Sequence, residues 1–294
     1  MKIDLFDDEM FDDEPQQPER PPRAPRRRRG SGETAKRVLV ALPWIVFAIA
    51  ITVAGGVVFA LAMVAIGVVA LREYAAIAGR YRPLLIPAYA AVAALVAAAY
   101  LGTAFNILYV IAATFPLLFA FAAKGQRREG ATVSLGVTLL GVLWIGIPLA
   151  HAVLLRELPD HGAALLIDVL VGTFVADTAA YATGRMFGSH KIAPNLSPNK
   201  TIEGLIGGFV IGTMGFWFAG LYQDWLSGVD ALMIGAAVAA VAPIGDLFES
   251  MLKRDLGTKD TGTLFGPHGG ILDRLDAVFF TVVVGYYLAV ALVY

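Results

Sequence analysis

The sequence predicts an all-α, polytopic integral membrane protein with about nine transmembrane helices, preceded by a disordered N-terminal tail. Three observations support this fold class: the composition, a series of apolar runs, and the placement of the basic residues. Of the 294 residues, 57% are hydrophobic and 16% are charged, and the mean hydropathy is +0.68. A soluble domain has roughly 45–50% apolar and about 25% charged residues. The apolar excess therefore argues against a soluble enzyme and against disorder over most of the chain.

The tail, residues 1–37, differs in composition from the rest. Met1 to Glu19 contain eight acids and one Lys, whereas Arg20 to Arg37 contain eight basic residues and one acid. With many prolines and almost no aliphatic side chains, this segment cannot bury enough apolar area to offset its ordering entropy, so we expect disorder. The residues 26–29, all Arg, fit a topology signal better than a contact with anionic lipid headgroups, because the acidic half competes for the same arginines.

The transmembrane catalytic domain is expected over residues 38–294, where apolar runs alternate with short polar loops. A helix needs about 20 apolar residues to cross a bilayer. The expected spans are residues 38–54, 56–71, 84–101, 105–123, 133–154, 163–184, 204–222, 231–249 and 275–293. Their many Ala and Gly residues suit close helix contacts in lipid, and strand-like alternation is absent. Gly55 and Gly56 between the first two spans fit either a tight turn or a kink.

The basic residues favour nine spans with a cytoplasmic N terminus, because cytoplasmic loops carry excess Lys and Arg. In this orientation the tail holds nine of the 23 basic residues, and the inner loops hold thirteen. These loops are residues 72–83, 124–132, 185–203 and 250–274. Arg156 alone falls on the outer side. We expect a multi-pass protein of the inner (cell) membrane with an external C terminus.

Two helices are predicted to carry carboxylates near the inner surface. Asp246, Glu249 and Lys253 occupy positions i, i+3 and i+7, which share one helix face. Asp273 and Asp276 repeat the i, i+3 spacing at the start of the last span. An acid at membrane depth usually faces a polar cavity and has a function. Because the chain has no Cys and four His, carboxylate oxygens for a hard cation such as Mg²⁺ are the expected ligands.

The inner loop between these two helices adds positive charge and a Gly-rich turn. Six acids and four bases fall within residues 246–276. Carboxylates beside bases suit a metal-bound polyphosphate, and we favour this interpretation over a loop whose acids merely balance topology signals. The bases are Lys253, Arg254, Lys259 and Arg274.

The preceding inner loop has matching chemistry. Asp177, Tyr181 and Arg185 are spaced i, i+4 and i+8, so they share one helix face that leads out of the membrane. Thr201 is expected to cap the next helix, whose amide-rich start favours an anion. Further polar candidates in this loop are Lys191, Ser197 and Lys200.

These two segments resemble the phosphatidate cytidylyltransferases, also called CDP-diacylglycerol synthases. The resemblance covers about residues 177–276, the expected active-site region, and it is carried by residues at the spacing of that family. They are Ser250-x-x-Lys253-Arg254, Lys259-Asp260, His268-Gly269-Gly270 and Asp273-Arg274-Leu275-Asp276. The Gly245-Asp246 pair and the Ser197-Pro198-x-Lys200-Thr201 segment are also similar to the family.

The resemblance implies an enzyme that transfers the cytidylyl group of CTP to phosphatidate, giving CDP-diacylglycerol and pyrophosphate in phospholipid biosynthesis. It implies Mg²⁺, with a second cation left open, and CTP, phosphatidate and the bilayer as partners, without nucleic acid. The implied metal ligands are Asp246 and Asp273 first, then Asp276, Glu249 and Asp177. The implied catalytic residues are Asp246, Asp273, Lys253, Arg254 and His268. The implied substrate-binding residues are Arg185, Lys191, Ser197, Lys200, Lys259 and Arg274.

Other functions fit the sequence less well. An ion-coupled transporter would explain acids within spans, but such proteins usually contain two related halves, and no internal repeat is present. A CDP-alcohol phosphotransferase would need an Asp-Gly dipeptide, which the chain lacks. Asp168, without polar neighbours, fits a structural hydrogen-bond partner as well as a functional acid. Glycines that fit either a homodimer contact or packing within one bundle are Gly204, Gly207, Gly208 and Gly212.

Overall fold

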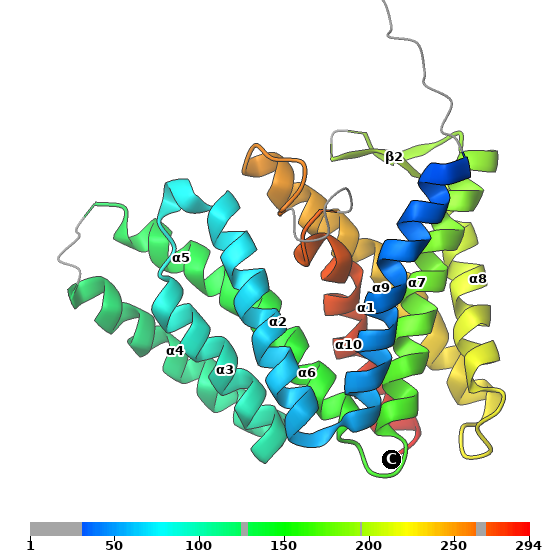
Figure 1. Ribbon diagram of the computed structural model, residues 1–294, viewed down its shortest axis with the longest axis horizontal. Helices are drawn as coiled ribbons and strands as arrows, with labels where there is room; N and C mark the ends of the chain where they lie inside the picture. The colour runs from blue at the N-terminus through cyan, green and yellow to red at the C-terminus, as the bar shows by residue number, and fades with distance from the viewer. Residues whose placement is uncertain (1–30, 125–128, 195, 263–268) are drawn as a thin grey trace, which may run out of the picture. The chain divides into compact units, whose positions relative to one another are not determined.

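The computed structural model describes residues 31–124, 129–194, 196–262 and 269–294, with side chains from residue 42 onward. The chain divides into two units, residues 1–41 and 42–294. In the described residues, the second unit consists of helices and one two-stranded antiparallel hairpin (Figure 1).

The first helices are α1 (Ser31–Ala54), α2 (Gly56–Ile77), α3 (Leu85–Leu101) and α4 (Ala104–Lys124), with a short 3₁₀ turn η1 (Gly79–Tyr81) after α2. Next, α5 (Ala131–Gly141), η2 (Val142–Gly146) and α6 (Ile147–Arg156) follow one another without a break. The chain ends with α7 (Gly162–Phe187), the hairpin β1 (Lys191–Ala193) and β2 (Ser197–Thr201), and helices α8 (Ile202–Gly220), α9 (Gly228–Asp255) and α10 (Leu272–Leu292).

Each of the nine predicted spans coincides with a helical segment of the described chain, which confirms an all-α, polytopic membrane protein. Seven segments are long and apolar enough to cross a membrane. The other two, Leu42–Ala54 and Leu85–Leu101, are shorter apolar helices. Helix α1 begins at Ser31, earlier than the predicted boundary, because residues 35–37 (Ala, Lys, Arg) are good helix formers. Residues 31–37, the end of the tail for which disorder was expected, are thus helical. For residues 1–30 the expected disorder lies outside the described residues and stays a prediction.

A tight turn, not a kink, separates the first two spans. Gly55 and Gly56 have φ values of +60° and +53°, which glycine adopts without strain, and α1 and α2 run in opposite directions on either side of them (Figure 1). Arg156 at the end of α6 donates from Nε to Thr52 O, near the C terminus of α1. Glu157 accepts from Gly56 N at 2.8 Å. Arg156, the predicted outer base, therefore helps to hold the C-terminal end of α1, where the helix dipole favours a positive charge.

Helix α8 packs against α7 through small residues. A Cβ on Gly208 would lie 2.8 Å from Ala180 Cβ, and a Cβ on Gly212 would lie 2.5 Å from Ala176 Cβ. Such contacts allow two backbones to approach closely in lipid. All four glycines of the predicted stripe face α7 in this way: Gly204, Gly207, Gly208 and Gly212. The four glycines thus serve packing within one bundle. They give no support to a homodimer, which stays a prediction.

A π-helical turn interrupts the span between α5 and α6 and presents a buried tryptophan to three other helices. The ring of Trp144 in η2 contacts Tyr74, Phe248 and Phe279 edge-on, with centroids 6.1, 5.3 and 6.0 Å away. These rings come from α2, α9 and α10. The N-terminal half of the chain is therefore packed directly against the two helices that carry the predicted acidic pairs.

Asp168 on α7 is fully buried and has a structural role. Its Oδ2 accepts a hydrogen bond from Gln223 Nε2 at 2.7 Å, which confirms the hydrogen-bond interpretation. Asp168 Oδ1 and Gln223 Oε1 are both buried without a hydrogen-bond partner in the described chain. Both of these oxygens only accept hydrogen bonds when the acid is ionised, so the Asp168–Gln223 pair lacks a hydrogen-bond donor.

Asp168→Asn should therefore keep or raise the free energy of unfolding, because the carboxamide supplies an N–H donor to a pair that lacks one. Asp168→Ala should lower it by about 1–3 kcal/mol, since Gln223 is left buried with unpaired polar atoms. Thermal unfolding of both variants in detergent makes the comparison. An Asn variant as unstable as the Ala variant would contradict this account of the pair.

Candidate active site

Helices α9 and α10 approach each other closely where the two predicted acidic segments meet. A Cβ on Gly245 would lie 2.3 Å from the backbone oxygen of Asp276 and 2.9 Å from Ala277 Cα. Only glycine lets the backbones come this close. The contact places the carboxylates of Asp246 and Asp276 near enough to interact electrostatically.

Lys253 bridges the two helices. Its Nζ lies 2.6 Å from Glu249 Oε2 on α9 and 2.8 Å from Asp273 Oδ1 on α10. The side chains of Glu249 and Asp273 are only 1% and 7% exposed. Burying a charge is costly unless it is paired and hydrogen-bonded. One ammonium group therefore compensates two carboxylates that would otherwise be isolated from water.

Asp273 also organises the chain that precedes α10. Its Oδ2 accepts hydrogen bonds from Thr261 N at 2.9 Å, Thr261 Oγ1 at 2.9 Å and Gly270 N at 2.7 Å. Gly269 has a φ of +81°, and a Cβ there would lie 2.4 Å from Asp273 Oδ2. The Gly-Gly pair of the motif thus lets the backbone wrap around this carboxylate. His268, which precedes it, lies outside the described residues, so its role stays a prediction.

Glu73 on α2 reaches the same place, although it was not among the predicted site residues. Its Oε1 accepts from Ile271 N at 3.0 Å, and its Oε2 accepts from Leu272 N at 3.1 Å. Glu73 Oε2 also accepts from Thr261 Oγ1 at 3.4 Å. In the sequence, Glu73 stands just beyond a predicted span. An acid at the end of an apolar run was the only signal that could have drawn attention to it.

An ion pair joins the two inner segments that were predicted separately. Lys200 Nζ on β2 lies 2.6 Å from Asp246 Oδ2 on α9. A second link is formed by Arg254, whose Nε donates to Leu196 O at 3.4 Å. The hairpin between α7 and α8 is thereby tied to the acidic face of α9.

The hairpin is fixed at its base by the start of α8. Thr201 caps this helix as predicted, with Oγ1 accepting from Gly204 N at 3.1 Å. A Cβ on Gly188 would lie 2.7 Å from Thr201 Oγ1, so glycine allows the end of α7 to approach the cap. Glu203 accepts from His190 N at 3.2 Å, and its Oε1 lies 2.7 Å from His190 Nδ1. These contacts set the position of the strand that carries Lys200.

Asp177 contributes from a third helix. It is close enough to Asp246, Asp276 and Lys200 to interact electrostatically with each. We call the following five residues the carboxylate cluster: Asp177, Asp246, Glu249, Asp273 and Asp276. In the described chain, Lys200 and Lys253 form ion pairs with three of its members. Five carboxyl groups thus share two ammonium groups, so the cluster has more oxygen donors than these ion pairs use.

The donor set of the cluster fits Mg²⁺, which prefers carboxylate oxygens. Glu249 Oε1 is buried without a hydrogen-bond partner in the described residues. However, no three His, Asp or Glu side chains in this part of the chain are already arranged to hold a metal ion. Asp246 and Asp273, the ligands implied first, both pair with lysines. Asp273 Oδ2 is further occupied by three protein donors.

The other predicted substrate-binding residues lie outside these ion pairs. Arg185 Nη1 donates to Tyr181 OH at 3.0 Å on an exposed part of α7. Ser197 is half-buried and pairs with Ala193 in the hairpin. The predicted substrate-binding residues with exposed side chains are Arg185, Lys191, Lys259 and Arg274.

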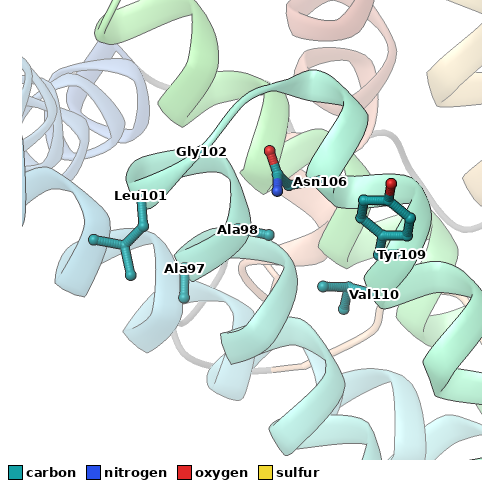
Figure 2. A pocket seen from close by; sticks show the side chains of 7 residues that line it. All are labelled: Ala97, Ala98, Leu101, Gly102, Asn106, Tyr109 and Val110. Carbon is teal, nitrogen blue, oxygen red and sulfur yellow. The ribbon is translucent and has the colours of Figure 1, made fainter.

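A hollow of about 290 Å³ lies between α3 and α4 and is separate from this chemistry. Ala97, Ala98 and Leu101 line it from α3, and Asn106, Tyr109 and Val110 line it from α4 (Figure 2). Asn106 Oδ1 already accepts from Thr103 N at 2.8 Å. None of the predicted site residues lines this hollow.

Comparison with known proteins supports the motif assignment. A model of the cytidylyltransferase family matches residues 35–292. The chain is 34% identical to Uncharacterized protein YnbB of Escherichia coli over 197 residues, which is 64% of this chain and 66% of that protein. It is 40% identical to a phosphatidate cytidylyltransferase of Haemophilus influenzae over 125 residues, or 41% and 43% of the two chains. A phosphatidate cytidylyltransferase of Synechocystis is 29% identical over 291 residues, covering 87% and 97%.

The alignments with the Escherichia coli and Haemophilus proteins span less than two thirds of those relatives' own length. The Synechocystis alignment, in contrast, extends over almost the whole of both chains.

Lys253→Met should lower the free energy of unfolding by about 3–5 kcal/mol, because it leaves two buried carboxylates without their shared cation. Adding Glu249→Gln should recover part of this loss, since one of the uncompensated charges is then removed. Denaturant unfolding in detergent measures both, with the exposed Lys259→Met as the matched control. Equal stability of Lys253→Met and the control would contradict the bridging role.

Proposed function

The chain belongs to the cytidylyltransferase family, and on that premise we propose that it transfers the cytidylyl group of CTP to phosphatidate. The products are CDP-diacylglycerol, a precursor for phospholipid biosynthesis, and pyrophosphate. The protein is thus proposed to be a nucleotidyltransferase. The names of the relatives in Haemophilus influenzae and Synechocystis support the choice of phosphatidate as acceptor.

The observation that carries the proposal is the junction of two separate inner segments at the carboxylate cluster. Lys200 of the hairpin pairs with Asp246, and Lys253 pairs with Glu249 and Asp273. Carboxylates and ammonium groups interleaved at one place suit a substrate that brings both phosphates and a divalent cation.

In the proposed reaction, a phosphate oxygen of phosphatidate attacks the α-phosphorus of CTP. One oxygen–phosphorus bond forms as the bond to the departing pyrophosphate breaks. The attacking oxygen is already anionic, so no strong general base is needed. The barrier comes from charge repulsion and from placement of the two substrates.

Basic residues of the chain would reduce the repulsion between the two negatively charged substrates. Lys200 and Lys253 lie within the cluster, and we propose that they bind phosphate oxygens there. Arg254 lies beside the hairpin, where it contacts Leu196 O. The exposed bases of the same inner segments would bind the outer phosphates or the lipid headgroup. They are Arg185, Lys191, Lys259 and Arg274, with Ser197 and His268 as further donors.

Mg²⁺ fits the cluster by donor chemistry, and when bound it would offset the charge that builds up on the polyphosphate. Asp246 and Asp273 are the first proposed ligands, followed by Asp276, Glu249 and Asp177. These side chains would have to rearrange around the ion, because no three of them are already arranged to hold it in the described chain. A second cation is compatible with the excess of carboxylates.

The proposed setting is the inner (cell) membrane, with the N terminus and the active site on the cytoplasmic side. One substrate is soluble and the other keeps its acyl chains in the bilayer, so a site at the membrane surface gives access to both. The placement of Lys and Arg supports this orientation. The proposal needs no nucleic acid, and a homodimer is compatible with it.

Purified protein incubated with Mg²⁺, labelled CTP and phosphatidate should form labelled lipid. Asp246→Asn should lower turnover by about 10²–10³-fold, the usual loss when one electrostatic group is removed from a preorganised site. Asp230→Asn is the matched control on the same helix, because Asp230 lies in the first turn of α9 and interacts with Ser227 there. No lipid product from folded wild-type protein, or full activity in Asp246→Asn, would refute the assignment.

A further inference from the structure

We propose that Glu73 of α2 is a positioning residue that fixes the start of α10, and with it Asp273, for the cytidylyl transfer. This inference rests on the function proposed above. Glu73 lies outside residues 177–276, the region over which the motif resemblance extends. It would give the N-terminal half of the chain a direct role in the active site.

Helix α10 is capped from another helix. Within the described chain, no side chain at the helix's own N-cap position accepts its free amides, although the first turn of any helix leaves such donors unsatisfied. Glu73 supplies the missing acceptors from another helix, with Oε1 on Ile271 N at 3.0 Å and Oε2 on Leu272 N at 3.1 Å. Asp273 Oδ2 takes the preceding amide, Gly270 N, at 2.7 Å. Three successive amides are therefore held by two carboxylates.

Two glycines leave space for the Glu73 carboxylate. A Cβ on Gly270 would lie 2.3 Å from Glu73 Oε2, and a Cβ on Gly262 would lie 2.6 Å from Glu73 Oε1. Both positions therefore have to be glycine for Glu73 to enter. Gly270 belongs to the His-Gly-Gly motif, so one reason for that glycine is access of the Glu73 side chain.

Glu73 is also connected to the carboxylate cluster. Thr261 Oγ1 lies 3.4 Å from Glu73 Oε2 and 2.9 Å from Asp273 Oδ2, so one hydroxyl is shared by both carboxylates. Asp273 in turn pairs with Lys253. Glu73 thus acts on the cluster through the start of α10 and through Thr261. This arrangement identifies it as a positioning residue and not as a catalytic residue.

A contact close to Glu73 in the chain holds the end of α9. Arg80, in the η1 turn after α2, donates from Nη2 to Asp255 O at 2.9 Å. An acid therefore contacts the N terminus of α10 and a base contacts the C terminus of α9, each with the sign that the helix dipole favours. The same short stretch of chain holds both ends of the connection between α9 and α10.

The test compares Glu73→Gln with Glu157→Gln. Glu157 is a matched control because its carboxylate also accepts a backbone N–H, from Gly56 at 2.8 Å, at the start of a different helix. Glu73→Gln should lower kcat by about 10²-fold, as expected for a small misplacement of reacting groups, with a smaller change in KM for CTP. Glu157→Gln should leave both constants unchanged.

Hydrogen–deuterium exchange gives a second readout that needs no activity. The Glu73→Gln protein should exchange faster in peptides covering residues 269–275, whereas Glu157→Gln should do so only near Gly56. Unchanged exchange in residues 269–275 of Glu73→Gln would overturn the positioning role. Faster exchange in Glu73→Gln with an unchanged kcat would show that Glu73 holds the start of α10 but does not affect the reaction, and this would overturn the proposal. If Glu73→Gln does not fold, Thr261→Val removes the shared hydroxyl and should show the same effects at smaller size.

The two proposals fail in distinguishable ways. Absence of CDP-diacylglycerol from wild-type protein would reject the proposed function, but the exchange experiment would still decide whether Glu73 holds the start of α10. An active wild-type protein with an equally active Glu73→Gln variant would reject this inference and leave the proposed function intact.

Discussion

The rest of the site depends on how the chain keeps carboxylates at the edge of a membrane bundle. Lys253 meets this constraint by pairing with Glu249 and Asp273 at once, at 2.6 and 2.8 Å. Because both acids are almost fully buried, removing the ammonium group would leave charges that neither water nor the bilayer can stabilise. The bridge also ties α9 to α10, so the same interaction solves an electrostatic problem and aligns the two acidic helices. Lys200, on the hairpin, forms an ion pair with Asp246 in the same way.

Close backbone approach is the second condition, and glycine provides it at each contact that matters for the site. Gly245 lets α9 approach the backbone of α10, and Gly270 leaves room for Glu73. Gly208 brings α8 against α7, the helix that carries Asp177. In lipid, such contacts supply the packing that the hydrophobic effect supplies in water. The glycines of the motif therefore allow close approach of the backbone, while its acids and bases form ion pairs.

Much of this architecture could be predicted from the sequence, because apolar runs and helix-face spacing are local signals. Every predicted span coincides with a helical segment of the described chain, and the cap at Thr201 was visible from its position before an apolar run. The pairing of Lys200 with Asp246 could not be predicted from local pattern, since it depends on how the hairpin folds back over α9. For the same reason, local pattern could not link Glu73 to the site. Its partners are backbone amides nearly two hundred positions away, and backbone amides have no signature in sequence.

If the cluster supports attack on the α-phosphorus of CTP, the α-phosphate and the γ-phosphate of CTP must end in different products. The purified protein would receive phosphatidate, Mg²⁺ and CTP labelled at either the α- or the γ-phosphate. We predict that the α label enters the lipid and that the γ label leaves as pyrophosphate. Transfer of the γ label to the lipid would instead show phosphoryl transfer, and this result would refute attack on the α-phosphorus.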